Sequence, residues 1–237
     1  MYQYNHQRPT PNFYFDAARG NLYDVRAVNI FGFNRVVGTA YETFWNYGGI
    51  YPLLGSATTL TAVSSASDTM SILISGLDSS YNEISEIVAL NGVTPVATTK
   101  SFLRVNSAVI LSGSNVGNIT ISSGATVIGY IEAGIGVTQS CTYTVPAGHS
   151  LYLARIDVNS ATVNPNKYLT IHNVVCSSTG RTLRVAEATF ATSQVSYDRQ
   201  VPFKIDEKND FSFECKSSSG ENEVAIFVEA VLCRNSY

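Results

Sequence analysis

The side chains that could hold a metal are few and scattered along this chain. The three histidines are His6, His149 and His172, and no two of them form a His-x-His pair. A metal-binding jelly roll would need clustered histidines and a carboxylate, and no cysteine has CxxC or zinc-ligand spacing. We therefore expect no metal and no other cofactor.

Nucleophilic catalysis has no recognisable motif either. No Gly-x-Ser-x-Gly turn occurs, and the stretch 113–115 (Gly-Ser-Asn) is typical of a turn. Cys176 is the most exposed cysteine by sequence, but no neighbouring residue marks it as activated. Cys141, Cys215 and Cys233 lie in apolar, strand-like runs, where a free thiol behaves as a small hydrophobe. We expect four free thiols, as in a reducing cytoplasm, with two disulfides as the alternative.

Carboxylates give no clearer signal. The chain has 18 Asp and Glu residues, enough for pairs near strand ends to arise by chance, so they do not by themselves indicate a glycosidase. The acidic run 206–210 (Asp-Glu-Lys-Asn-Asp) is expected to be a solvated turn rather than a calcium loop. The sequence therefore predicts a protein that is not an enzyme.

The overall composition points to assembly. Hydrophobic residues make up 45% of the chain, but charged residues only 14%, against about 25% in typical domains. A net charge of -3 without basic clusters argues against nucleic acid and anionic membranes, and we see neither a signal peptide nor a membrane helix. Because low charge weakens the solubility of a free monomer, we expect much of the surface to be covered by other proteins. An ordinary secreted β-protein is the alternative.

The elements that must carry this surface are short strands. In residues 69–122, runs such as 70–75 alternate apolar and small polar side chains, and turn residues separate them at near-regular intervals. Asn91-Gly92 is a strong hairpin signal. The last run, 223–233, is apolar on both faces, which predicts a central strand or a strand inside an assembly. Trp45 is expected to be a buried anchor. About a dozen such strands predict an all-β fold, an antiparallel β-sandwich or jelly roll, in one unit or in two stacked sandwiches.

The chain divides into three segments. Residues 1–24 are predicted to form an extended N-terminal arm, because Pro9 and Pro11 prevent regular pairing. Residues 25–137 form a first sandwich half or domain, and residues 138–237 a second, jelly-roll half or domain. The arm is too aromatic for a solvated tail, although a disordered terminus is the alternative. Its expected partner-binding anchors are Tyr4, Phe13, Tyr14 and Phe15.

Several longer segments carry a family resemblance. These are FGFNRVVGTAYETFWNYGGIY (31–51), the stretch 74–106 that begins ISGLDSSYNEISEIVALNG, SNVGNITI (114–121), YTVPAGHSLYL (143–153) and the closing stretch 205–232. Together they resemble virion structural proteins of tailed phages, especially marine T7-like podoviruses. The resemblance spans roughly residues 25–233, and the first block is its most specific part.

The resemblance implies a non-enzymatic component of a tailed-phage virion, assembled in the host cytoplasm. We expect a homo-oligomer at the tail or head–tail region that also contacts other virion proteins. One alternative is a capsid decoration protein. Another is a receptor- or carbohydrate-binding module that contacts a host surface glycan, with Tyr51, Tyr81 and Tyr197 as candidate exposed aromatics.

Overall fold

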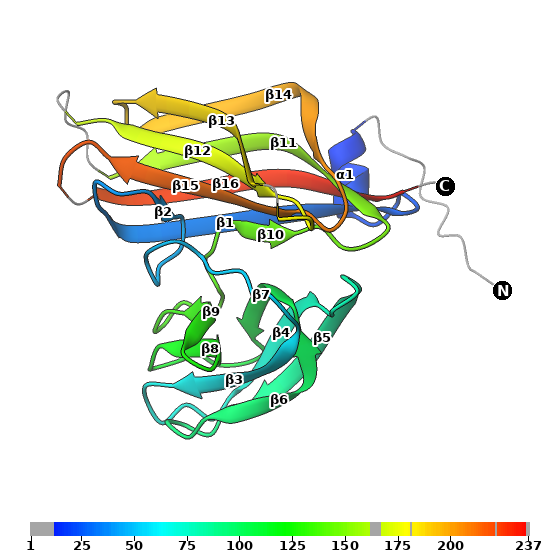
Figure 1. Ribbon diagram of the computed structural model, residues 1–237, viewed down its shortest axis with the longest axis vertical. Helices are drawn as coiled ribbons and strands as arrows, with labels where there is room; N and C mark the ends of the chain where they lie inside the picture. Colours follow the sequence, from blue (N-terminus) through cyan, green and yellow to red (C-terminus); the bar gives the residue numbers. More distant parts are fainter. Residues whose placement is uncertain (1–11, 162–166, 181, 221, 236–237) are drawn as a thin grey trace.

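The computed structural model describes residues 12–161, 167–180, 182–220 and 222–235. In this part of the chain the elements are sixteen strands and one six-residue helix, which confirms the predicted all-β fold. Every strand pairing is antiparallel, and the strands form two lobes that are joined by a narrow neck (Figure 1).

The larger lobe, at the top of Figure 1, is a two-sheet sandwich built from both ends of the described chain. One sheet has the strand order β1-β16-β11-β14, and the other has the order β10-β15-β12-β13 with the short strand β2 on β15. The bounds are β1 (Val25–Val37), β2 (Glu42–Thr43), β10 (Thr142–Thr144), β11 (His149–Ser160), β12 (Leu169–Cys176), β13 (Thr182–Phe190), β14 (Gln194–Ile205), β15 (Asp210–Ser217) and β16 (Asn222–Arg234).

The strand order of this lobe is that of a jelly roll. With β2 set aside, the first strand pairs with the last (β1 with β16), and the second with the second to last (β10 with β15). The nesting continues inward, with β11 on β14 and β12 on β13. A long hairpin of nested pairs that rolls up into two facing sheets is the double Greek key of the jelly roll.

The smaller lobe is inserted between β2 and β10 of the jelly roll. Its sheets have the orders β6-β3-β8-β9 and β5-β4-β7. The bounds are β3 (Thr58–Ser64), β4 (Ser71–Leu77), β5 (Glu83–Ala89), β6 (Val96–Phe102), β7 (Arg104–Ile110), β8 (Ile119–Ser123) and β9 (Thr126–Ile131).

The chain enters and leaves the inserted lobe through the neck, where the backbone N–H of Cys141 donates to Phe44 O and Trp45 pairs with Ser140. A Cβ at Gly32 would lie 2.5 Å from Phe44 O, so only glycine lets β1 pass this close to the neck.

This division differs from the boundary predicted after residue 137. Strand β1, which was assigned to the first domain, pairs along most of its length with β16 and belongs to the jelly roll. The pairing joins residues about 200 positions apart, so the local pattern of alternation cannot reveal it. The insert, residues 58–131 from β3 to β9, is the part that forms a separate sandwich.

Each lobe has its own hydrophobic core. The jelly-roll core includes Phe44, Phe211, Phe213, Leu151, Leu153 and the inward face of β16 (Val224, Ile226, Val228, Ala230 and Leu232). The core of the inserted lobe includes Leu60, Ile72, Ile74, Phe102, Ile119 and Ile121. Trp45 is buried in the second core at the neck, as predicted for an anchor, and β16 is central in its sheet.

The described part of the N-terminal arm is helical rather than extended. Helix α1 (Phe13–Ala18) begins after Asn12, whose side chain accepts a hydrogen bond from the backbone N–H of Phe15 at 3.1 Å. This capping satisfies one of the free N–H groups of the first turn. Asp16 and Ala17 are buried, and α1 lies at the same end of the jelly roll as the C-terminal end of β16 (Figure 1). Tyr4, Pro9 and Pro11 lie outside the described residues.

Candidate partner-binding surfaces

The side chains that usually bind metals or act as nucleophiles are dispersed or buried in the described part of the chain. Within the described ranges, no three His, Cys, Asp or Glu residues lie close enough to hold a metal ion. In the same ranges, no helix is long and apolar enough to cross a membrane. All four cysteines are free, and burial raises the pKa of the Cys141 and Cys215 thiols well above the ordinary value. These two thiols are therefore held in their unreactive protonated form.

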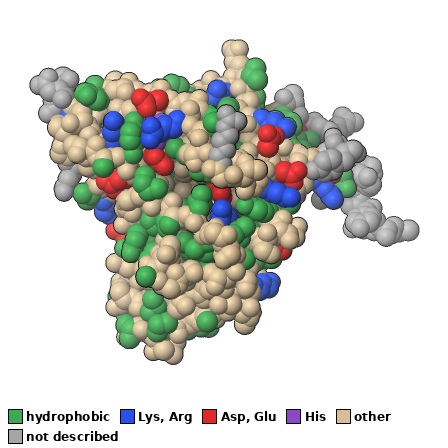
Figure 2. Space-filling view, in the orientation of Figure 1, with side chains coloured by type: hydrophobic (Ala, Val, Ile, Leu, Met, Phe, Trp, Pro, Cys, Tyr) green, Lys and Arg blue, Asp and Glu red, His purple; other side chains and the backbone are tan. Residues whose placement is uncertain are grey.

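His172 is a packed residue on the outer face of the β10-β15-β12-β13 sheet. Its Nε2 lies 2.6 Å from Glu214 Oε2, and the ring of Tyr41 stacks on it at 4.0 Å. The Tyr41 hydroxyl donates to Glu187 at 3.1 Å. Charged side chains gather on the jelly roll in Figure 2. The contacts hold the β1–β2 loop, which carries Tyr41, against the sheet.

Helix α1 presents three aromatic side chains to solvent. Phe13, Tyr14 and Phe15 are each about half exposed (51%, 49% and 51%), and the rings of Phe13 and Tyr14 meet edge to face at 5.5 Å. Because the short helix buries Asp16 and Ala17, the aromatic side chains are left on its outer side. The structure thus brings together three of the four predicted anchors, and Tyr4 lies outside the described residues.

A second aromatic group lies on the outer face of the β1-β16-β11-β14 sheet. Phe31 on β1 is directly opposite Phe227 on β16, with ring centroids 4.5 Å apart, and Phe227 is 47% exposed. On the same face of β1, the guanidinium of Arg35 lies 5.0 Å from the ring of Phe33. These rings form an apolar strip on the two strands at one edge of the sheet, on the face that is turned to solvent.

The inserted lobe has an apolar row on the outer face of its three-stranded sheet. Ile87 on β5, Leu73 on β4 and Val109 on β7 are register partners, and Val109 also pairs with Val137. Ile87 is 62% exposed, and Val109 and Val137 are 37% exposed. We call Ile87, Leu73, Val109 and Val137 the apolar row. The sequence pattern of residues 69–122 did not reveal the apolar row. An exposed apolar row alternates with polar residues along a strand in the same way as a row that faces the core.

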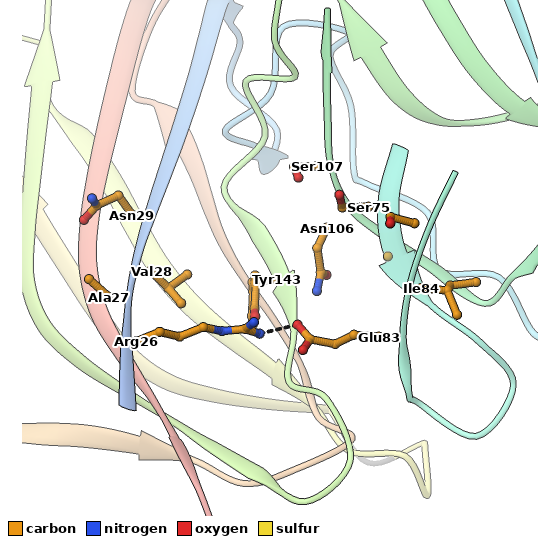
Figure 3. Close-up of a pocket in the computed structure, with 12 residues that line it drawn as sticks. Arg26, Ala27, Val28, Asn29, Ser75, Glu83, Ile84, Asn106, Ser107 and Tyr143 are labelled. Atoms are coloured by element: carbon orange, nitrogen blue, oxygen red, sulfur yellow. Dashed lines mark hydrogen bonds and ion pairs between the residues drawn. The ribbon is translucent and has the colours of Figure 1, made fainter. Parts of the chain in front are cut away.

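The neighbouring register row is made of serines and forms one wall of a groove between the lobes. Ser75 on β4 pairs with Ser85 on β5 and with Ser107 on β7. The groove has a volume of about 510 Å³, and its opposite wall is the start of β1 with Tyr143 (Figure 3). The Arg26 side chain reaches across it to form an ion pair with Glu83. Burial raises the pKa of Tyr143 to about 12, so its hydroxyl stays protonated.

A buried ion pair fixes the two lobes to each other beside this groove. Arg104 on β7 donates to both carboxylate oxygens of Asp210 on β15, at 2.6 and 2.9 Å. Thr144 also donates to Asp210 at 2.5 Å, and the side chain of Asn106 makes two hydrogen bonds to the backbone of Thr144. Both members of the ion pair are less than a tenth exposed. The groove is therefore a preformed feature rather than a flexible gap.

The three tyrosines considered for glycan binding do not form a common surface. Tyr51 is buried, and its hydroxyl donates to Ile128 O at 2.6 Å, so the expectation of an exposed ring was wrong. Its apolar ring is needed to fill the space between the neck and the inserted core. Tyr81 is half-buried in the β4–β5 turn, and Tyr197 is 41% exposed on β14.

Comparison with known proteins gives little beyond this geometry. No protein-family model and no curated protein matches the chain. Among solved structures it is similar to that of the infectious bursal disease virus Gt strain (TM-score 0.26, 12% identity, 89% of this chain and 72% of that one). It is also similar to the VP2 subviral particle of that virus (TM-score 0.21, 11% identity, 90% and 77%) and to its T13 viral particle (TM-score 0.25, 13% identity, 90% and 74%). These TM-scores are too low for the likeness to support an argument about fold or function.

Proposed function

We propose that this protein is a non-enzymatic structural component of a virion that works as a homo-oligomer in contact with other virion proteins. The observation that carries the proposal is the exposure of three separate apolar surfaces on one folded chain. They are the α1 aromatics, the Phe31–Phe227 strip and the apolar row of the inserted lobe. Soluble monomers rarely expose several such surfaces, whereas subunits cover them on assembly.

The jelly roll supports the proposal without deciding it. Jelly rolls occur in viral capsid proteins, lectins and cupins, and fold alone does not assign function. A cupin-type site would need clustered metal ligands, and the described residues hold no such cluster. The sequence resemblance to virion proteins of tailed phages favours the virion. On that resemblance we propose a position at the tail or head–tail region, with capsid decoration as the alternative.

The mechanism we propose is docking through preformed surfaces. Interfaces are stabilised mainly by buried aromatic and aliphatic anchors within a polar rim. Phe13, Tyr14 and Phe15 would be the anchors at the end of the jelly roll, and the apolar row would be the anchor on the inserted lobe. The serine row beside the apolar row would supply an uncharged polar rim that costs little to desolvate.

Oligomeric mass in solution tests the proposal. In analytical ultracentrifugation we expect the wild type to be an oligomer, and the double variant Phe13→Ser, Phe15→Ser or the single variant Ile87→Ser to shift toward monomer. Val93→Ser, at a 66% exposed apolar position in a turn, is the matched control and should leave the mass unchanged. A wild type that stays monomeric at high concentration, with all variants alike, would refute assembly through these surfaces.

Incorporation into particles tests the position. Deletion of residues 1–24 should leave a folded protein but prevent its incorporation into virions, and normal copy number in the particles would rule out the arm as an anchor. A reconstruction of the intact virion would then show the protein at the tail or head–tail region. Density on the capsid surface instead would favour decoration.

A second candidate function, glycan binding, is favoured by the groove between the lobes. Its lining is rich in neutral hydrogen-bonding side chains, among them Ser75, Asn106 and Ser107, with Tyr143 beside them (Figure 3). A sugar needs such donors and acceptors together with an aromatic ring. Binding on a glycan array that is lost in the double variant Ser75→Ala, Ser107→Ala would support this function, and a blank array would remove it.

A further inference from the structure

The jelly roll contains a hollow at the edge where β13 and β14 end its two sheets. Its volume is about 480 Å³, and it opens between these two strands. Most of its lining is apolar, with a few charged residues at the mouth. The apolar and aromatic members of the lining are Ile156, Ile171, Ala186, Ala188, Tyr197, Val201 and Phe213.

The hollow exists because small side chains occupy positions where the rest of the sandwich has large ones. On β13, Ala186 is the register partner of Asn173 and Ala188 is the partner of Ile171. Ile171 belongs to the core, so the side chains opposite it and two residues further along face inward as well. Two alanines cannot reach the facing sheet, which is about 10 Å away in a sandwich. The space between them and Tyr197 on β14 is therefore unfilled.

An irregularity in β14 widens the opening. Leu153 on β11 pairs with Phe203, but the next pair along joins Arg155 to Asp198, so residues 199–202 have no partner on β11. This extra length bends β14, as a bulge does at the edge of a sheet. Val201 lies in this stretch and is 81% exposed.

Two buried polar residues, His172 and Asn173, also line the hollow, and each has a side-chain atom without a hydrogen-bond partner among the described residues. The ring of His172 packs against Tyr41 and Glu214 on the outer face of the sheet, whereas Asn173 shares the inner face with Ile171. Asn173 lines the hollow, is only 4% exposed, and its Oδ1 accepts no hydrogen bond from the described residues. Its partners across the sheet are Phe213 and Ala186, neither of which has a side-chain donor. A buried acceptor without a donor is unfavourable, and such groups in folded proteins call for an explanation. A single bound water molecule would be a poor explanation for the unpaired Oδ1, because a buried water needs two to four polar partners.

We propose that this hollow is a binding site for a small, neutral, mainly aromatic molecule that donates one O–H or N–H hydrogen bond to Asn173 Oδ1. A mainly apolar lining with a few placed polar groups is typical of small-molecule sites, and the volume lies within their usual range. It is about three times that of a 150 Å³ cavity that accepts benzene, so two fused rings fit. The mouth carries Arg199 together with Asp198 and Glu187, and this mixture of signs favours a neutral ligand.

A matched pair of probes tests the site on the purified full chain. 2-Naphthol has two fused rings and one O–H donor, and 2-methoxynaphthalene has the same rings without the donor. By isothermal titration calorimetry we expect 2-naphthol to bind at least about fivefold more tightly, the effect of one hydrogen bond. Asn173→Leu should remove this preference while the ether still binds, because the apolar lining remains.

Filling the hollow should abolish binding of both probes. Ala188→Leu places a large side chain in the space, whereas Ala97→Leu makes the same change at an exposed position of the inserted lobe and should bind as the wild type does. Ala186→Leu serves as a second filling variant if Ala188→Leu does not fold. No saturable binding of 2-naphthol at millimolar concentration would overturn the proposal. Unchanged binding in a folded filling variant, or an unchanged preference in Asn173→Leu, would do the same.

Discussion

The two lobes are both β-sandwiches, but they distribute charge very differently. The inserted lobe, residues 58–131, carries only six of the charged residues of the chain, and two of these are buried. The six are Asp68, Asp78, Glu83, Glu86, Lys100 and Arg104. The jelly roll and its connections carry the rest. Figure 2 shows the lower lobe almost entirely in the colours of neutral polar and hydrophobic groups, with the charged side chains on the upper lobe.

The lobes also differ in how their interiors are filled. The core of the inserted lobe joins both of its sheets through large aliphatic side chains, whereas the jelly-roll core ends at the hollow between β13 and β14. A low-charge surface over a filled core can be covered by a partner at little desolvation cost. A charged sandwich with one unfilled edge is better suited to hold a ligand. The difference is consistent with the proposals made for the two lobes: both carry exposed apolar docking surfaces, but only the jelly roll has an unfilled space that a ligand could enter.

The largest expected effect comes from breaking the joint between the lobes. Asp210→Asn leaves Arg104 buried without its counter-charge, and we expect a loss of about 3–5 kcal/mol in the free energy of unfolding. Because the inserted lobe has its own core, denaturant unfolding should then separate into two transitions, one for each lobe.

A double variant is the control for this joint. Arg104→Met with Asp210→Leu removes both charges and should cost much less than Asp210→Asn alone, since no unpaired buried charge remains. If Asp210→Asn costs less than about 1 kcal/mol, the ion pair behaves like an exposed one and does not fix the lobes.

The same Ile→Ala substitution at a core position and at a surface position of the inserted lobe should have different effects on stability. Ile74→Ala, at a fully buried position on β4, should cost about 2–5 kcal/mol in urea unfolding. Ile87→Ala, at the 62% exposed end of the apolar row, should cost less than about 0.5 kcal/mol. Equal losses would mean that the apolar row is part of the fold rather than a docking surface.

A smaller, pH-dependent effect is expected at Asp68. Burial alone would raise its pKa, but hydrogen bonds from Ser64 and from the backbone N–H groups of Val116 and Gly117 lower the pKa below its ordinary value. The ionised carboxylate therefore stabilises the inserted lobe above about pH 4, the ordinary pKa of Asp. This contribution is lost as the pH falls through the lowered pKa of the folded state.

Substitution by asparagine isolates this contribution. Asp68→Asn should cost about 1–3 kcal/mol at neutral pH, the value of hydrogen bonds to a charged group. The difference in unfolding free energy between the wild type and the variant should shrink below about pH 4. Glu229→Gln, at an exposed position on β16, is the control for general effects of charge removal. A difference that does not change with pH would show that Asp68 contributes through its shape alone.

Local patterns predicted the fold class but not how the strands combine. Alternation marked most strands, and the double apolar face of residues 223–233 correctly indicated a central strand. Asn91-Gly92 does form a turn, but the turn joins β5 and β6, which lie in different sheets, so it closes no hairpin. The insertion within the jelly roll escaped prediction because the β1–β16 pairing depends on long-range register.

The candidate surfaces were predicted only in part for a related reason. Aromatic residues before the first strand led to the prediction of anchors at Phe13, Tyr14 and Phe15. The structure shows these side chains half exposed on α1, and their role as anchors stays a prediction. Neither the apolar row nor the hollow has such a signal. Ile87 resembles a core residue, and Ala188 becomes informative only when the facing sheet is known to lie beyond its reach.

The smallest expected effect is that of an Ala→Leu substitution, which can be made in the interior of each lobe. Ala62→Leu overfills the core of the inserted lobe, where Ala62 is fully buried, and should cost about 1–3 kcal/mol in urea unfolding. Ala188→Leu enters the hollow of the jelly roll, and we expect a change between zero and a gain of about 1 kcal/mol, because the added methylenes bury apolar surface without displacing a neighbour. A comparable loss in Ala188→Leu would mean that β13 and β14 close on each other in solution, and the difference in filling between the lobes would disappear.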